Sequence, residues 1–322
     1  MYSARNVAPR KSYLAIAMIN VQPGPSQLFH SVRDHVRQAF KLRIPELLPS
    51  GDEARELAQQ TAKQLRELLA VPDSHEVFFL PETRSFIDEA MRVVGNSSAL
   101  SHDVLLSNDV TLNPDTKLLV IHHTESGGTS LRPEVFTHLR DRGDDSLIAV
   151  DASLAWPYAS LPFETIDAVF LEFHVGFGMP AGLGAAIVND RWIQRHRTMR
   201  TSPEPIHPSL NLTWVSVLGG VLGDMLSRGI ITIRRETEYK SSLLYHLLDQ
   251  HPLIQPIVKE KANRSRTIIA ARADDIGRIQ DELRRHAITA GFAGNSVTFA
   301  NFPSHSKEQY ERLADILSAI RQ

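Results

Sequence analysis

Short runs of apolar residues alternate with segments of helical periodicity through the first two thirds of the chain. Between residues 52 and 70, the apolar positions Ala58, Ala62, Leu65 and Leu69 fall on one stripe of a helix. Five runs that are apolar at nearly every position lie at residues 76–80, 117–121, 146–150, 168–173 and 184–188. Such runs are typical of strands that are covered on both faces, as in parallel sheets. The pattern predicts an α/β domain with a largely parallel central sheet.

The pattern changes after the apolar helix expected at residues 215–226. The elements expected beyond it are a strand at 267–273, a helix near 274–286, a strand at 297–302 and a last helix that opens at Ser306. This order is typical of a smaller α+β domain. We expect the large domain to cover residues 12–228 and the small domain to cover residues 229–322.

The composition of the chain excludes several kinds of binding partner and several kinds of chemical site. The 322 residues carry a formal net charge of −2, so the chain lacks the basic surface that nucleic acid or anionic lipid requires. It contains no cysteine, which excludes disulfides and thiolate metal sites and fits a cytoplasmic location. The apolar run near residues 13–21 is too short to span a bilayer, so we expect neither a signal peptide nor a transmembrane helix.

Three stretches in both halves of the chain carry a family resemblance. They are INVQPGPSQL at 19–28, the run 150–192, and IRRETEYKSSLLYHLL followed by NRSRT and FANFPSHSKEQY. Within the second, FGMPAGLGAAIVND resembles the glycine-rich turn and strand that follow the cofactor lysine in the class V pyridoxal-phosphate aminotransferases, in the phosphoserine aminotransferase-like group. The resemblance implies a fold-type-I architecture and a homodimer whose cleft lies between the subunits.

The resemblance also assigns the centre of the site. Asp151 matches the aspartate that pairs with the pyridine nitrogen of the cofactor in this family, although an aspartate at a strand end can also simply cap the next turn. Counted back without gaps from Gly182, His174 takes the family's glutamine slot and Val175 takes the slot of the Schiff-base lysine. Valine has no amine, and no lysine occurs between Lys117 and Lys240. Ordinary lysine-dependent transamination is therefore expected to be lost.

The family's phosphate cup is also altered. The turn after the strand at 76–80 begins with Pro81, which has no N–H to donate, and continues with Glu82, which brings a negative charge. The donors left for a phosphate are Thr83, Arg84 and Ser85.

Two further family groups are missing. The segment between Met91 and Lys117 is several dozen residues shorter than the family pattern, and no aromatic residue lies between Phe86 and Phe136 to stack on the cofactor ring. Thr298 stands where the family's small domain carries an arginine for the substrate carboxylate.

Some ligand-type residues remain. His122, His123 and Ser126 lie in a region that resembles the family's loop beside the cofactor ring, and Gly24 lies on the substrate side. Asn211 matches a residue that reaches the phosphate of the neighbouring subunit. The two histidines also fit a structural interpretation, as imidazoles hydrogen-bonded at a strand end. No spacing of ligands predicts a metal site.

Three functions remain open on this basis. The first is a pseudoenzyme that binds a small molecule in its cleft or regulates another protein. The second is an enzyme that holds pyridoxal phosphate or pyridoxamine phosphate non-covalently and uses His174 as its base. The third is an enzyme for a different ligand, with His122, His123, Asp151 and His174 as acid–base groups. The separate losses of lysine, phosphate donors, aromatic and arginine favour the first.

Overall fold

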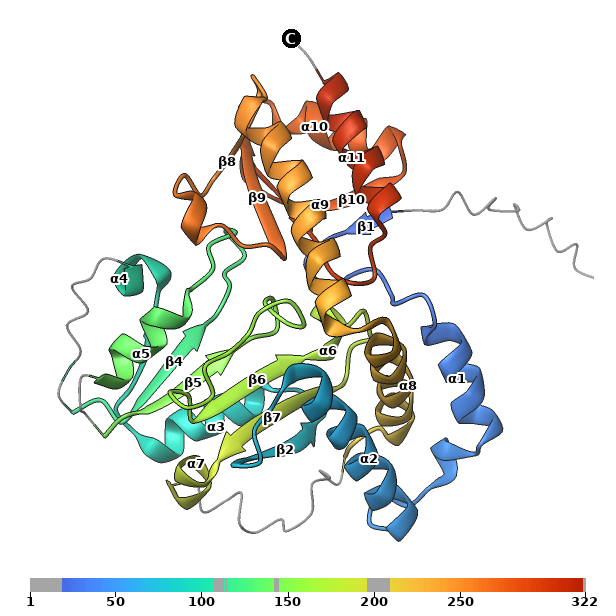
Figure 1. The fold of residues 1–322 in the computed structure, drawn as a ribbon, viewed down its shortest axis with the longest axis vertical. Coiled ribbons are helices and arrows are strands. Elements are labelled where there is room, and N and C mark those ends of the chain that lie inside the picture. The colour runs from blue at the N-terminus through green and yellow to red at the C-terminus, as the bar shows by residue number, and fades with distance from the viewer. Residues whose placement is uncertain (1–18, 107–112, 114, 142–144, 196–208, 321–322) are drawn as a thin grey trace, which may run out of the picture.

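The computed structural model describes residues 19–106, 113, 115–141, 145–195 and 209–320, and these build two sheets with helices packed on them (Figure 1). The expected domain start at residue 12 and most of the apolar run at 13–21 lie outside the described residues. No single described helix is long and apolar enough to cross a membrane. Helices α8 (Leu212–Arg228) and α9 (Ile230–Gln250) meet the length and hydropathy criteria only as a pair, with a bend of 83° between them.

The large sheet has six strands in the order β2-β7-β6-β5-β4-β3. Their bounds are β2 His75–Leu80, β3 Ser97–Leu100, β4 Leu118–His122, β5 Leu147–Asp151, β6 Ala168–Glu172 and β7 Gly184–Asn189. Only β7 runs against its neighbours, so the other five strands all end at the same edge. The mainly parallel sheet predicted from the apolar runs is confirmed.

Helices cover both faces of this sheet because alternate strand residues point to opposite sides. One face packs against α2 (Asp52–Leu69), α5 (Pro133–Asp141) and α8. The other face packs against α3 (Arg84–Val94) and α7 (Asp190–Arg195). The remaining elements of this part are α1 Val32–Lys41, η1 Ile44–Glu46, α4 His102–Leu106 and α6 Phe173–Gly176. This three-layer arrangement buries both faces of the sheet.

The second sheet has five strands in the order β1-β10-β11-β9-β8. The strands are β1 Ile19–Val21, β8 Ile254–Pro256, β9 Ile268–Ala273, β10 Ile288–Ala293 and β11 Ser296–Ala300, with η3 at Lys261–Asn263. Helices α9, α10 (Ile276–Arg285) and α11 (Lys307–Ala319) share one apolar core with it. The first described strand thus joins the sheet of the C-terminal half, because β1 pairs in parallel with β10. The capping box of Ser306 and Gln309 at α11 is also present.

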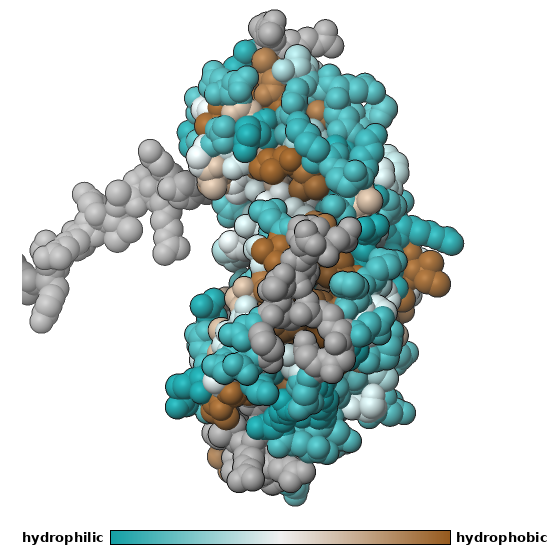
Figure 2. All heavy atoms as spheres, turned by 90° about the vertical axis from the view of Figure 1, so that its left-hand side faces the viewer, coloured by the Kyte–Doolittle hydropathy of each residue, from teal (hydrophilic) through white to brown (hydrophobic). Residues whose placement is uncertain are grey.

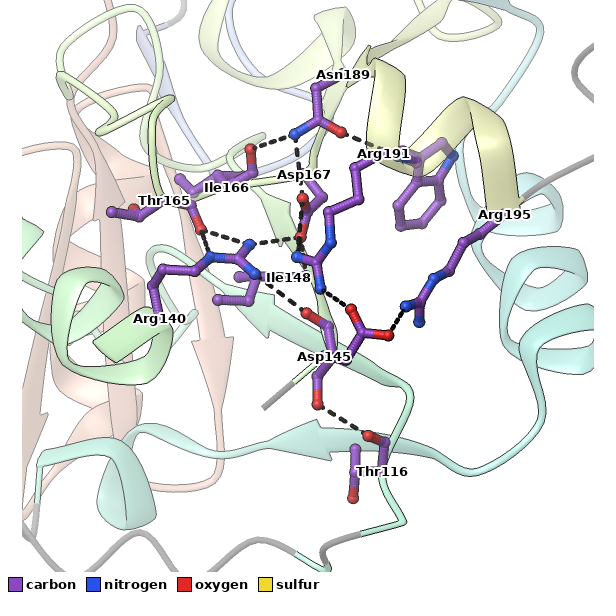
Figure 3. A network of polar contacts seen from close by, with 12 residues as sticks. Thr116, Arg140, Asp145, Ile148, Thr165, Ile166, Asp167, Asn189, Arg191 and Arg195 are labelled. Atoms are coloured by element: carbon purple, nitrogen blue, oxygen red, sulfur yellow. Dashed lines mark hydrogen bonds and ion pairs between the residues drawn. The ribbon is translucent and has the colours of Figure 1, made fainter. Parts of the chain in front are cut away.

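A polar network holds the strands together at the edge where β5 and β6 begin (Figure 3). Asp167 is buried at its centre and accepts hydrogen bonds from Arg140 at 2.6 Å and from the backbone N–H of Ile148 at 2.8 Å. Arg191 lies 3.2 Å from the same carboxylate and also binds Asp145, which is exposed. Both strands and α7 are therefore tied to one buried carboxylate.

The surface is mixed in character. On the face turned to the viewer in Figure 2, hydrophilic residues dominate, and apolar residues gather near the middle, between the upper and lower halves of the molecule.

Candidate functional site

The candidate site lies at the edge where the five parallel strands end. His122 closes β4, Asp151 closes β5 and Glu172 closes β6, while Thr83 follows β2. Parallel strands bring their carboxyl ends to one edge of a sheet, which is where α/β proteins place their ligands. The sequence identified three of these residues, and the structure adds Glu172.

Both carboxylate oxygens of Asp151 contact a neighbouring residue. Its Oδ2 lies 3.3 Å from Nδ1 of His122, and its Oδ1 accepts a hydrogen bond from the backbone N–H of Ser153 at 2.9 Å. Burial alone would raise the pKa of Asp151, but the hydrogen bonds from His122 and Ser153 outweigh it and lower that pKa. The same hydrogen bond raises the pKa of His122. Asp151 and His122 thus form a close imidazole–carboxylate pair, and Asp151 also caps the turn that follows its strand.

His123 does not belong to this pair. Its ring is buried and stacks on Phe136 with 5.9 Å between the ring centroids, and its Nδ1 lies 3.2 Å from the hydroxyl of Thr124. Burial lowers the pKa of His123 to about 4, so the ring is neutral near pH 7. The buried position of His123 is that of a structural residue, whereas His122 lies exposed at the edge.

Glu172 contacts the start of helix α3. Its Oε1 accepts hydrogen bonds from the backbone N–H of Thr83 at 2.6 Å and from the Thr83 hydroxyl at 2.7 Å. The backbone N–H of Glu172 donates to the hydroxyl of Ser153 at 2.9 Å. Thr83, which was predicted as a phosphate donor, therefore already has an acceptor within the chain.

Residues 173–176 form a single helical turn, α6, rather than a continuation of the strand. In a regular strand His174 and Val175 would point to opposite faces, whereas successive residues of a helical turn are about 100° apart. His174 Nδ1 lies 3.6 Å from Oε2 of Glu172. Val175 is buried in an apolar cluster with Ile268, which belongs to β9, and Phe302, which follows β11. His174 thus lies toward the strand ends, and Val175 lies in an apolar cluster.

The loop at Gly24 reaches both of these residues. A methyl group placed on Gly24 would lie 3.9 Å from Nε2 of His174 and 3.9 Å from Cγ2 of Val175. Thr298 lies close to the same loop, because both it and Pro23 approach Gly291 on the neighbouring strand. A cavity of about 480 Å³ adjoins Pro23, Gly24 and Gly291. The structure therefore brings together the two residues that the sequence placed on the substrate side.

Four other predicted residues lie apart from this cluster or have another role. Arg84 is exposed and pairs with Asp88 at 3.1 Å, one turn along α3. Ser85 and Ser126 are exposed. Asn211 is also exposed, and its side-chain oxygen caps α8 by accepting the N–H of Thr213 at 3.0 Å. Within one chain, the position of Asn211 is explained by helix capping.

Comparisons with known proteins place this geometry among the aminotransferases. No family model matches the sequence, and no curated protein matches it. Among solved structures, a phosphoserine aminotransferase from Cytophaga hutchinsonii is 27% identical with a TM-score of 0.85, over 93% of this chain and 98% of that one. The chain therefore resembles the phosphoserine aminotransferases and other class V-like aminotransferases over its whole fold. Its architecture is that of fold type I.

Solved aminotransferase structures of lower identity also have this fold. A phosphoserine aminotransferase from Bacillus circulans has a TM-score of 0.76 at 15% identity, over 93% of this chain and 97% of that one. The pyridoxal-phosphate-bound enzyme from Trichomonas vaginalis has a TM-score of 0.72 at 12% identity, over 93% of this chain and 99% of that one.

The residues at the strand ends do not fit a bound pyridoxal phosphate. Thr83 gives both of its donors to Glu172, and the carboxylate of Asp151 is shared between His122 and Ser153. The flanking lysines in the sequence lie elsewhere: Lys117 precedes the opposite end of β4, and Lys240 donates to the carbonyls of Phe302 and His305.

Proposed function

We propose that this protein is a degenerate phosphoserine aminotransferase-like protein that has lost ordinary lysine-dependent transamination and serves as a ligand-binding or regulatory pseudoenzyme. The observation that carries the proposal is the position of Val175. The residue matched to the lysine slot is buried with Ile268, Ala300 and Phe302, so its side chain has a packing role.

The chemistry of transamination explains why this change is decisive. The lysine forms the covalent link to the cofactor and then moves a proton between the substrate and the cofactor. Valine can do neither. Near the strand ends, the imidazoles of His122 and His174 each face a carboxylate.

These two imidazole–carboxylate pairs favour one second candidate, a cleft enzyme that acts on another ligand. A carboxylate beside a histidine can orient its ring and stabilise the protonated form. The version in which His174 serves a non-covalently bound pyridoxal or pyridoxamine phosphate has less support, since Thr83 is not free to hold the phosphate.

The first test combines a cofactor titration with an activity assay. We expect the absorbance of added pyridoxal phosphate to stay that of the free compound, and transamination of phosphoserine or glutamate to be negligible, because Val175 and Thr298 replace the two groups most directly needed. Turnover at ordinary aminotransferase rates would contradict the proposal. A band of bound cofactor without a covalent link to lysine would favour the His174 version of the second candidate.

The proposal includes a cytoplasmic homodimer. The segment that covers α1 and η1 exposes Phe40, Leu42 and Leu48, each by more than half of its surface. Exposed apolar residues grouped on one segment are typical of a protein interface. Light scattering at micromolar concentration is expected to give twice the mass of 36.0 kDa. A monomer at that concentration would count against the dimer.

A further inference from the structure

Helix α3 starts at the carboxyl edge of the large sheet, directly after β2. The first turn of a helix has N–H groups without acceptors of their own, and the helix dipole adds partial positive charge, so this end attracts anions. Here a carboxylate of the chain itself contacts Thr83, the N-cap residue of α3. Oε1 of Glu172 lies 2.6 Å from the Thr83 backbone nitrogen and 2.7 Å from the Thr83 hydroxyl oxygen.

The surroundings of Glu172 fit this contact closely. A side chain on Gly184, across from β6, would come within 2.7 Å of Cγ2 of Thr83 and 3.3 Å of Oε1 of Glu172. On its other side, Oε2 of Glu172 is 3.6 Å from Nδ1 of His174, a buried nitrogen with no hydrogen-bond partner among the described residues. The carboxylate thus lies between an imidazole and a helix start, which favours negative charge.

We infer that the carboxylate of Glu172 is the resident anion at the start of α3 and that it excludes phosphorylated ligands, free phosphate included, from this edge of the sheet. A phosphate at this point would have to displace Glu172 and take over both hydrogen bonds of Thr83. Glu82 adds a second negative charge to the same turn, and Pro81 has no N–H to donate. A ligand of the cleft is therefore one without a phosphate group.

This inference concerns anion binding and does not depend on the loss of the lysine. Pyridoxamine phosphate and pyridoxamine form a suitable pair of probes, because they differ only in the phosphate and carry no aldehyde that would react with surface lysines. Calorimetric titration of the wild-type protein should show no preference for pyridoxamine phosphate over pyridoxamine, and no binding of inorganic phosphate. The variant Glu172→Ala, which frees Thr83, should bind pyridoxamine phosphate at least about tenfold more tightly than the wild type does.

Two further variants distinguish the effect of the contact between Glu172 and Thr83 from a general effect of negative charge on phosphate binding. Glu82→Ala removes an exposed carboxylate from the same turn and leaves the contact between Glu172 and Thr83 in place, so it should bind no phosphate. In Glu172→Ala, the additional change Thr83→Val removes the hydroxyl donor and keeps the backbone N–H, so it should reduce the gain. A folded Glu172→Ala protein, checked by circular dichroism, that gains no affinity for phosphate would overturn the inference.

If Glu172→Ala does not fold, the affinities of the wild-type protein for the two probes test the inference. A preference for pyridoxamine phosphate that Thr83→Val removes would show that Thr83 is open to phosphate, and would refute the inference. Equal affinity for the two probes would support it. Phosphate binding without any covalent label on a lysine would refute only this inference and leave the proposed loss of lysine chemistry standing.

Discussion

Replacing Gly176 with alanine is expected to destabilise the fold by more than about 3 kcal/mol, because the new methyl group has no space. Gly176 ends the helical turn α6, one residue after Val175. Its added Cβ would overlap the carbonyl oxygen of Trp156, and would lie 3.0 Å from the Trp156 carbonyl carbon and 3.4 Å from the carbonyl oxygen of Ser153. All three are backbone atoms, which cannot rotate away as a flexible side chain could.

A matched substitution elsewhere controls for the loss of a glycine. Gly127 lies in a loop, and a Cβ added there meets no atom within 4 Å. We expect Gly127→Ala to change the free energy of unfolding in urea by less than about 0.5 kcal/mol. Equal stability of Gly176→Ala and the wild type would show that the turn before the glycine-rich segment can move, and would weaken the placement of Val175.

The variant Asp167→Asn is expected to cost about 3 kcal/mol of stability. Asp167 is only 2% exposed and accepts hydrogen bonds from Arg140 and from the N–H of Ile148, while Arg191 lies 3.2 Å away (Figure 3). Removal of one partner of a buried ion pair leaves the other charge uncompensated, which typically costs more than the pair itself contributes. Because the two arginines are partly exposed, we expect the lower end of the usual range. Chemical denaturation measures the loss.

Asp145 provides the control within the same network. It binds Arg191 and Arg195, but its side chain is 73% exposed, so water screens the contact. Asp145→Asn should therefore shift the denaturation midpoint far less than Asp167→Asn does. Similar losses in the two variants would contradict the central role assigned to the buried carboxylate.

Much of the large domain could be predicted from the sequence because its strands are buried on both faces. Runs such as 117–121 and 146–150 are apolar at nearly every position. The observed strands β4 and β5 have the same lengths and are each shifted by one residue toward the C-terminus. Strand β3 was missed, since an edge strand of four residues, SSAL, has no such pattern. Strand β1 was missed for a different reason: its three residues pair with β10, which lies near the other end of the chain.

The sequence identified site residues that lie at the ends of strands. It did not identify those whose position depends on a turn or on a distant part of the chain. Asp151 and His122 close adjacent parallel strands, and the sequence placed both at the cleft. Glu172 was treated as part of the apolar run 168–173, because its partner Thr83 comes from a distant strand and no local pattern joins them. Its position next to the His174–Val175 pair was the available signal. The helical turn at 173–176 was also missed, since a four-residue turn has no periodicity of its own.

The most direct test of the central claim is borohydride reduction in the presence of pyridoxal phosphate, followed by peptide mapping by mass spectrometry. If Val175 occupies the lysine slot, the reduced protein should carry no stoichiometric label on any one lysine and none on the peptide around residue 175, and only scattered surface labelling that grows with the concentration of the aldehyde. A stoichiometric label on a single lysine would show that the chain retains a cofactor lysine, and would contradict the proposed loss of transamination.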